Sequence, residues 1–258
     1  MPILNDLFAS LAAIAAGIIN ALAGGGTLIT FPTLLSIGLS PVVANVTNTI
    51  ALCPGFLGGT LAQASDLKNQ KKRLYLAVPA ALLGGLTGGF LLLRTSEKLF
   101  SNLVPFLILL AAGLLALQNP LRNWLTRRQA HARVRYTPET WIVLPVFLGA
   151  IYGGYFGAGL SIIMLAVLGL ILNDNLTRLN ALKQSIGFSA NIAAALLFVF
   201  SGKINWNVAI VMMVGALLGG SLGGRLASRV KPNVLRWIVV SIGFVVGTIY
   251  LVKTYFMV

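Results

Sequence analysis

The residue with the clearest chemical potential is a lysine inside an apolar stretch. Lys183 lies in the run 179–200, and a lysine near the middle of a membrane costs about 2.5–3.5 kcal/mol on insertion scales. No acidic side chain in the neighbouring apolar runs stands out as its partner, so the pattern favours a substrate anion in that role. The alternative is a lysine that reaches the membrane interface close to Arg178. The five acidic residues all lie in or near links or ends: Asp6, Asp66, Glu97, Glu139 and Asp174.

Amide and hydroxyl side chains lie at matching positions in two parts of the sequence. The first group follows Pro41, and the second surrounds Lys183. Such groups can orient an anion, but they can also form hydrogen bonds between helices, which contribute about 0.6 kcal/mol each. Both interpretations stay open for the uncharged members. The candidate binding residues of the two groups are Asn45, Thr47, Asn48, Thr49, Lys183, Gln184, Ser185 and Asn191.

Two glycine clusters break the apolar pattern. The stretches Gly24-Gly25-Gly26 and Gly157-Ala158-Gly159 introduce the short apolar pieces 27–38 and 159–172. Broken backbone at membrane depth is tolerated where it lines a cavity or is buried in protein, and a helix N-terminus attracts anions. The clusters therefore predict two half-helix N-termini that bind a substrate anion. Close helix packing is the alternative, and it is the better interpretation for four other glycines: Gly84, Gly88, Gly219 and Gly223.

The elements that position these residues are membrane-spanning helices. Of the 258 residues, 57% are hydrophobic and 9% are charged, whereas a soluble domain has about 25% charged residues. This composition excludes a soluble enzyme, a secreted disulfide scaffold and a disordered chain. A spanning helix needs about 20 apolar residues, and most runs qualify. The apolar runs are 3–23, 27–38, 41–64, 74–93, 99–118, 140–156, 159–172, 179–200, 206–224 and 234–256.

The sequence contains an internal repeat. AGGGTLITF at 23–31 aligns with FGAGLSIIM at 156–164, and LLGGLTGG at 82–89 aligns with LLGGSLGG at 217–224. We therefore divide the chain into a first transmembrane repeat, a basic cytoplasmic linker and a second transmembrane repeat. The linker is a repeat boundary rather than a boundary between independently folding domains. The three parts cover residues 1–118, 119–139 and 140–258.

Charge distribution predicts the orientation of the repeats. If each half crosses five times, the links 65–73, 118–139, 173–178 and 225–236 share one side and hold fourteen Lys and Arg residues, against four on the other side. Four crossings per half would give a weaker bias, so the positive-inside rule favours five. An odd number of crossings per half gives the second repeat the opposite orientation in the membrane to the first. Inverted repeats with broken helices are typical of secondary transporters. The predicted fold is an all-α integral membrane protein with about ten helical segments in two inverted five-segment repeats.

One stretch resembles a known family. The run GIINALAGGGTLITFPTLLSIGLSPVVANVTNT at 17–49 resembles the first-repeat signature of the sulfite exporter TauE/SafE family, and 149–191 resembles its partner motif. The resemblance spans nearly the whole chain. It implies an integral membrane permease for sulfur-containing and organic anions such as sulfite, thiosulfate, sulfonates and sulfoacetate. Asn48 stands where serine is frequent in that family.

The expected function is secondary transport of a small anion across the cytoplasmic membrane, with a sulfur oxyanion or organosulfonate as substrate. An inside-negative potential expels a monoanion with about 2.3 kcal/mol per 100 mV, so export is favoured. An anion channel and a coupled importer of organic anions stay open as alternatives. An enzyme is not expected, because the apolar runs contain no nucleophile–base pair or metal cluster. The expected partners are the anion, membrane lipid and, as an open alternative, a second copy in a homodimer; neither a cofactor nor nucleic acid is expected.

Overall fold

The fold is helical throughout the part of the chain that the structure describes. The computed structural model describes residues 2–22, 25–131, 138–226 and 232–256, and these ranges contain ten α-helices, two short 3-10 helices and no strand. Five helices (α3, α4, α5, α8 and α10) are long and apolar enough to cross a membrane. The predicted all-α membrane fold is therefore confirmed. The helices are α1 (Pro2–Leu22), α2 (Thr27–Ser36), α3 (Pro41–Ala62), η1 (Ala64–Leu67), α4 (Lys71–Arg94), α5 (Glu97–His131), η2 (Glu139–Ile142), α6 (Val143–Tyr155), α7 (Leu160–Ile171), α8 (Leu176–Val199), α9 (Trp206–Leu226) and α10 (Pro232–Tyr255).

Several helix starts follow directly from residue type. Pro41 is the first residue of α3, a position where its missing N–H removes no helical hydrogen bond. Asn175 caps α8, because its side-chain oxygen accepts a hydrogen bond from the N–H of Arg178 at 2.9 Å. Gly159 precedes α7 with a φ of 82°, a left-handed conformation that glycine adopts without steric cost. Local residue types therefore determine where one helix ends and the next begins.

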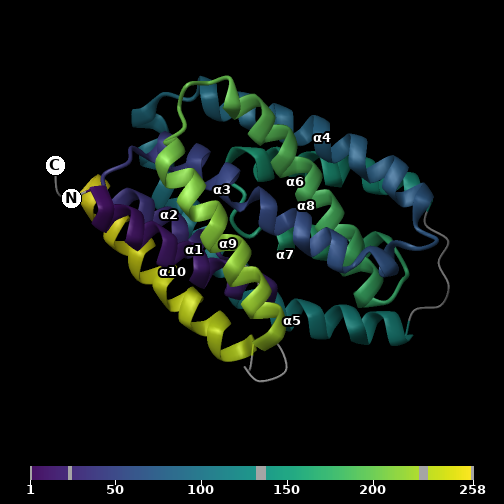
Figure 1. Ribbon diagram of the computed structural model, residues 1–258. Coiled ribbons are helices and arrows are strands. Elements are labelled where there is room, and N and C mark those ends of the chain that lie inside the picture. The colour runs from purple at the N-terminus through teal and green to yellow at the C-terminus, as the bar shows by residue number, and fades with distance from the viewer. Residues whose placement is uncertain (1, 23–24, 132–137, 227–231, 257–258) are drawn as a thin grey trace.

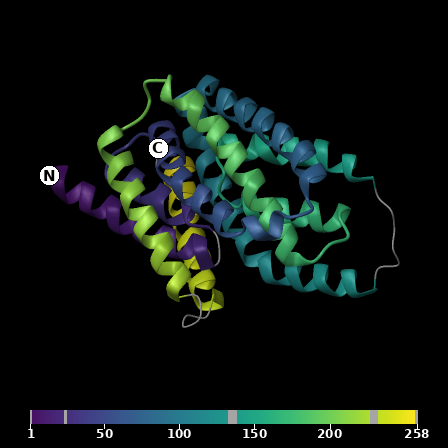
Figure 2. The same ribbon diagram turned by 45° about the vertical axis from the view of Figure 1, so that its right-hand side comes forward.

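Helices of each sequence half pack against helices of the other half. The helix α1 packs along α9, and α4 packs along α6. Figures 1 and 2 show α1, α9 and α10 on one side of the bundle and α4, α6 and α8 on the other, with α3 in contact with both α8 and α9. In each pair the first helix of one half meets the fourth helix of the other. Two repeats related by a two-fold axis would produce this reciprocal pattern, although the inverted repeat itself stays a prediction.

Glycines allow close approach of the two helix pairs that join the halves, α4 with α6 and α1 with α9. A Cβ on Gly84 would lie 2.5 Å from the carbonyl oxygen of Phe147 in α6, and one on Gly88 would meet the α6 backbone as well. On the other side of the bundle, a Cβ on Gly219 would meet the backbone of α1. The packing interpretation of these three glycines is confirmed. The surroundings of Gly223 lie outside what the structure describes.

Charged links from both halves meet at one end of the bundle. Arg73 donates to Glu139 Oε1 at 2.9 Å and also pairs with Asp174. Arg178 lies 3.4 Å from the same Asp174 carboxylate. These contacts bring together the links that precede α4, α6 and α8. The structure thus places these three links on one side, as the charge distribution predicts for five segments per half.

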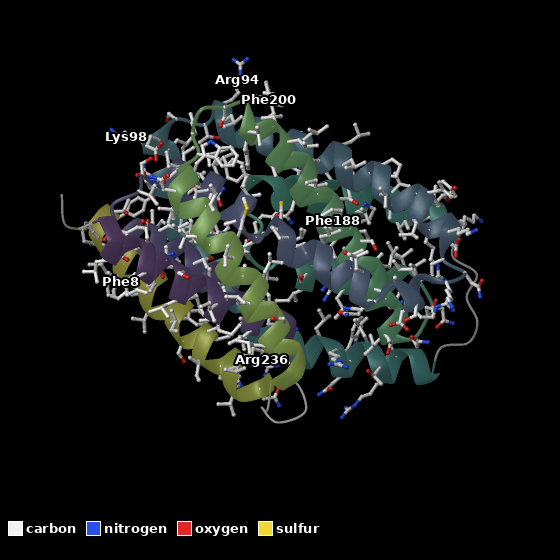
Figure 3. The ribbon with its side chains drawn as sticks, viewed as in Figure 1. Phe8, Arg94, Lys98, Phe188, Phe200 and Arg236 are labelled. Carbon is white, nitrogen blue, oxygen red and sulfur yellow. The ribbon has the colours of Figure 1, made fainter. Side chains whose placement is uncertain are left out.

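The opposite end of the bundle carries fewer charges. Glu97 Oε1 accepts a hydrogen bond from the backbone N–H of Val42 at 2.9 Å, which joins the start of α5 to the start of α3. Figure 3 shows Arg94 and Lys98 near this end and Arg236 near the other. With only four crossings per half, the links before α4 and α8 would lie on opposite sides. Their contact agrees with the sidedness expected for five segments per half, and the number of membrane crossings stays a prediction.

The helix α5 is longer than the apolar run that predicted it. The run ends at residue 118, but the helix continues through half of the expected linker to His131. Leu121 and Leu125 are one helical turn apart and belong to an apolar cluster with residues of α7 and α8. Leu125 is fully buried and lies against Gly169. This buried face, rather than membrane-length hydrophobicity, extends the helix.

Candidate anion-binding site

The first glycine break turns the chain between α1 and α2. Gly25 has a φ of 92°, and a Cβ there would lie 2.8 Å from Leu115 in α5. The N–H of Gly26 donates to Asn20 Oδ1 at 2.7 Å. An α1 side chain therefore already satisfies one of the donors that the sequence assigned to a substrate. The predicted site residue Gly24 lies outside the described residues.

The second glycine break turns the chain between α6 and α7. Gly157 and Gly159 have φ values of 79° and 82°. The hydroxyl of Tyr152 donates to the carbonyl of Ala158 at 2.6 Å and holds the turn against α6. A Cβ on Gly159 would lie 3.1 Å from Leu114 Cδ1 in α5. The break is therefore tightly enclosed, and its backbone faces neighbouring helices.

Both breaks lie against the same part of α5. Leu114 and Leu115 are adjacent residues near the middle of this 35-residue helix. The rings of Phe31 in α2 and Phe156 after α6 also pack edge to face, with centroids 5.3 Å apart. The structure thus brings the two predicted clusters together in the interior of the bundle. Their role in binding an anion stays a prediction.

The polar group of α3 is buried and largely engaged in hydrogen bonds. Asn45 Nδ2 donates to the carbonyl of Tyr155 at 2.8 Å, and Thr47 Oγ1 accepts from the backbone N–H of Asn205 at 3.1 Å. Thr49 Oγ1 donates to the carbonyl of Asn45 at 2.9 Å. The first two bonds connect α3 to the end of α6 and to the link before α9. These atoms therefore hold helices together in the structure described here.

Two amide oxygens of the same group have no hydrogen-bond partner. Oδ1 of Asn45 and Oδ1 of Asn48 are both buried without one, and Asn48 is only 2% exposed. The two residues are three positions apart, so they lie on one face of α3. An unsatisfied buried acceptor costs about 1–3 kcal/mol. A water, a cation or a donor group of a ligand would satisfy both oxygens.

Lys183 differs from the other predicted residues of α8. Ser185 and Asn191 donate to carbonyls one turn earlier in α8, at 3.3 and 2.8 Å. Lys183 is partly buried, and within the described ranges it forms no hydrogen bond or ion pair. The charge that acts on it is another cation, the exposed guanidinium of Arg122 in α5. Two like charges from two helices create a locally positive site.

Most of the α8 group is separate from the α3 group. A Cβ on Gly59 in α3 would lie 2.8 Å from Gln184 Nε2, and Asn180 Nδ2 donates to Gln63 Oε1 at 2.6 Å. Gly59 follows Thr49 by about 15 Å along α3, at 1.5 Å per residue. Lys183, Gln184 and Ser185 therefore lie near the C-terminal half of α3 and the charged links, whereas Asn191 lies about 10 Å further along α8 toward the α3 group, because Gly187 of α8 meets Phe56 of α3. The α3 group lies beside the break between α6 and α7.

One buried cation was not among the residues predicted from the sequence. Arg236 is 5% exposed, and its Nε has no hydrogen-bond partner. Its guanidinium carbon lies 5.6 Å from the centroid of the Trp237 ring. From the sequence it belongs to the link 225–236, but the structure places it inside α10. Its spacing of three and seven residues from Val239 and Gly243 was the available signal for an inward-facing side chain.

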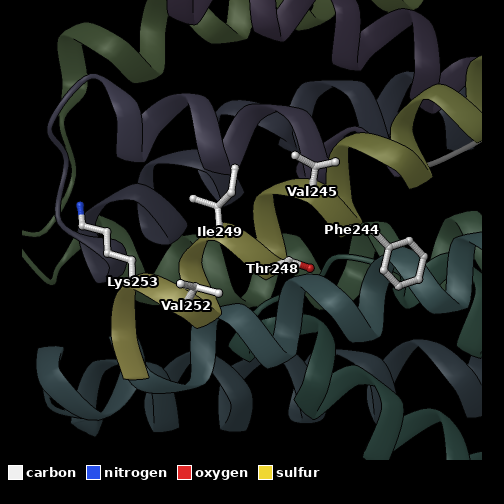
Figure 4. A pocket seen from close by; sticks show the side chains of 6 residues that line it. All are labelled: Phe244, Val245, Thr248, Ile249, Val252 and Lys253. Carbon is white, nitrogen blue, oxygen red and sulfur yellow. The ribbon is translucent and has the colours of Figure 1, made fainter. Parts of the chain in front are cut away.

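A groove on α10 lies away from the candidate site. Its lining side chains project from one helix and are largely exposed, as Figure 4 shows. The groove is apolar except for a threonine and a terminal lysine, and it faces the surroundings of the bundle. It is therefore a surface that membrane lipid would cover. The lining residues are Phe244, Val245, Thr248, Ile249, Val252 and Lys253.

Comparison with known proteins yields one family and several bacterial relatives. The family model described as "Sulfite exporter TauE/SafE" matches residues 9–250. A "Probable membrane transporter protein" of Haemophilus influenzae is 34% identical over 229 residues, which cover 89% of this chain and 88% of the relative. The "Probable membrane transporter protein YfcA" of Escherichia coli K12 is 26% identical, covering 91% and 85%, and "ORF9" of Sinorhizobium sp. is 29% identical, covering 82% and 79%. No solved structure matches.

Proposed function

Because this chain belongs to the sulfite exporter TauE/SafE family, we propose that it exports a small anion, a sulfur oxyanion or an organosulfonate, across the cytoplasmic membrane. The family and the long apolar helices make the chain a multi-pass membrane transporter. The substrate class and the direction are the proposed part. The observation that supports an anionic substrate is the unpaired Lys183 of α8.

The described acids leave no carboxylate for Lys183. Glu97 accepts from the start of α3, while Glu139 and Asp174 both bind Arg73. The charged side chain that acts on Lys183 is that of Arg122, and it repels the ammonium. A substrate anion would neutralise this local charge, and charged groups inside membrane segments commonly mark substrate pathways. The arrangement therefore supports an anionic substrate.

The donors near Lys183 suit an anion with several oxygens. A lysine ammonium provides three N–H donors, and a glutamine amide provides two. Gln184 follows Lys183 directly and lies beside Gly59 of α3. Sulfite and sulfonates present three oxygens from one sulfur, which the three N–H donors of the Lys183 ammonium can bind. This match supports a sulfur oxyanion and does not distinguish sulfite from a sulfonate.

The proposed direction follows from electrostatics. An inside-negative potential drives a monoanion outward with about 2.3 kcal/mol per 100 mV. Export on this gradient requires no coupling ion. The described carboxylates lie at helix ends or bind backbone and arginine groups, and none of them is positioned as an intramembrane proton carrier. Uncoupled export is therefore the simplest mechanism for this chain.

One observation favours coupled import as a second candidate. The unsatisfied Oδ1 atoms of Asn45 and Asn48 are hard oxygen ligands of the kind that can bind Na⁺ beside a broken helix. A bound Na⁺ would allow its inward gradient to drive anion uptake. Sodium dependence of transport therefore separates this candidate from uncoupled export.

Reconstituted protein tests the proposal. Proteoliposomes loaded with unlabelled sulfite should accumulate labelled sulfite transiently, because a carrier exchanges its substrate across the membrane and a channel does not. Parallel assays with thiosulfate, methanesulfonate and acetate define the substrate class. Failure of every anion to exchange or to raise the melting temperature of the purified protein would overturn the proposal. Exchange that requires Na⁺ would establish the coupled alternative instead.

A further inference from the structure

Exposed aromatic side chains gather at the end of the bundle where the charged links meet. Trp124 of α5 is 49% exposed, Trp141 of η2 is 67% exposed and Tyr75 of α4 is 79% exposed. Arg73 joins the first turn of α4 to Glu139 of η2 at 2.9 Å, so the elements of Tyr75 and Trp141 are in contact. Tryptophan and tyrosine are enriched where a membrane protein meets the lipid headgroups. This end of the bundle therefore has the side chains of a membrane interface.

One apolar cluster anchors both tryptophans. Leu125 follows Trp124 directly, Ile142 follows Trp141 directly, and both aliphatic side chains are fully buried. They belong to the same cluster as Leu168 of α7, and α7 contacts both α5 and η2. The two indole rings therefore project outward from elements that share one core, near the end of α7.

Basic side chains lie among these aromatic residues. The guanidinium carbon of Arg128 lies 5.6 Å from the centroid of the Trp124 ring, and Arg128 also donates to the carbonyl of Leu170 in α7 at 3.2 Å. The side chain of Lys72 in α4 is 76% exposed, and its Nζ lies 3.9 Å from Glu139 Oε2. The cations therefore come from the same elements as the aromatic residues, or from the helix turn beside them.

The acids at this end do not balance the cations. Glu139 and Asp174 both bind Arg73, whose side chain is only 15% exposed. Lys71 and Arg122 are exposed and take part in no ion pair with a described residue. The exposed surface of this end is therefore positive, and a negatively charged partner complements it.

The helix α5 carries Trp124 to the depth of the lipid headgroups. Its 35 residues extend over about 52 Å, whereas the hydrocarbon core of a bilayer is about 30 Å thick. The apolar run ends at residue 118, and Trp124 lies about 9 Å further along the helix. The pair of Trp124 and Arg128 is therefore outside the hydrocarbon, at the level where phosphate groups lie.

We propose that Tyr75, Trp124, Trp141, Lys72 and Arg128 form a docking surface for the headgroups of anionic phospholipids at the predicted cytoplasmic face. A guanidinium binds phosphate oxygens through parallel hydrogen bonds, and aromatic rings suit a boundary that is apolar on one side and wet on the other. Each basic residue near an anionic membrane surface strengthens binding about fivefold. The inference is independent of the transported anion and of the direction of transport.

Quenching of tryptophan fluorescence by brominated lipids tests this docking surface. The full-length variant Trp206→Phe/Trp237→Phe keeps only Trp124 and Trp141 of the four tryptophans. It is reconstituted in phosphatidylcholine vesicles that contain an equal fraction of either brominated phosphatidylglycerol or brominated phosphatidylcholine. The relative association constant from quenching should be at least about fivefold higher for phosphatidylglycerol, because the cations attract its phosphate.

Charge variants in the same two-tryptophan protein assign the preference to residues. Lys72→Gln/Arg128→Gln should lower the preference for phosphatidylglycerol to less than about twofold, since both charges of the surface are lost. Lys72→Arg/Arg128→Lys keeps both charges and should keep most of the preference.

Trp206 provides the matched control for position. It is 46% exposed and lies near the opposite end of the bundle, because the N–H of the preceding Asn205 donates to Thr47 in the first half of α3. A variant that keeps only Trp206 should be quenched by the two lipids to within about twofold, since few cations lie at that end. An equal preference for phosphatidylglycerol at Trp206 would overturn the docking surface.

The remaining outcomes also decide the proposal. Equal quenching of Trp124 and Trp141 by the two lipids would overturn it. Quenching by neither lipid would overturn it too, because a protein or a second copy would then cover the surface. A preference that survives in the double glutamine variant would overturn the role of Lys72 and Arg128. If that variant does not fold, the two-tryptophan protein is measured in 1 M NaCl, where the Debye length is about 3 Å, and an undiminished preference there overturns the proposal.

Discussion

Replacing Lys183 by methionine should weaken anion binding without weakening the fold. Methionine keeps an unbranched apolar stem of similar length and removes only the ammonium. A hydrogen bond to a charged group contributes about 1.5–3 kcal/mol, which corresponds to about a 10- to 150-fold rise in Kd. The melting temperature should stay unchanged or rise, because Lys183 has no ion-pair partner among the described residues and is repelled by Arg122.

Weaker anion binding together with an unchanged or higher melting temperature is a combination that is easy to refute. The assay pairs sulfite or methanesulfonate titration of the purified variant with its thermal unfolding in the absence of ligand. Lys183→Arg should restore only part of the affinity, since a planar fork does not reproduce a compact ammonium. Lys183→Glu should bind less well than the methionine variant, because it places a negative charge beside the anion. Unchanged Kd with a lower melting temperature in Lys183→Met would show that the lysine is structural.

Three further predictions concern topology and glycine. Both termini should be extracytoplasmic and the linker cytoplasmic; a cysteine introduced at Val258 should react with an impermeant reagent from outside, and protection there would contradict the ten-segment topology. Gly25→Val and Ala158→Val should abolish transport while the protein still inserts, because both positions are enclosed by neighbouring helices; normal exchange by both variants would reduce the breaks to packing sites. Gly84→Ala should lower stability by about 1–3 kcal/mol, because its Cβ would lie 2.5 Å from the Phe147 carbonyl; an unchanged melting temperature would show that α4 and α6 can separate freely.

Most of the fold could be predicted because its signals are local. Glycine clusters, Pro41 and the Asn175 cap act within a few residues, so the expected segments agree with the helices to within a few positions. The end of α5 was missed because Leu121 and Leu125 extend it by packing against α7 and α8. Such a contact depends on tertiary structure, and the basic residues around it indicated a link.

The candidate site was harder to predict because its residues depend on how helices cross. The two glycine breaks, which align in the repeat, do meet at α5. The α3 and α8 groups align in the repeat, yet Lys183, Gln184 and Ser185 lie at a different level of α3 from the α3 group. Asn45 and Thr47 form hydrogen bonds with the end of α6 and with the link before α9. Arg236 was counted with the link 225–236 because its charge groups it with the basic residues that precede it in the sequence. Only its register with Val239 and Gly243 reveals that it faces inward.

The exchange of helices between the halves has a consequence for biosynthesis. When residues 1–118 have entered the membrane, α1 and α4 still lack α9 and α6, the helices along which they pack in the finished protein. Their glycine-rich faces are then without the partners that allow close approach. The helix α4 gains its partner α6 at the start of the second half, but α1 must stay in the bilayer without α9 until translation of the second half is nearly complete. A chain that stops at the linker would leave a product for quality control to remove, rather than half of a transporter.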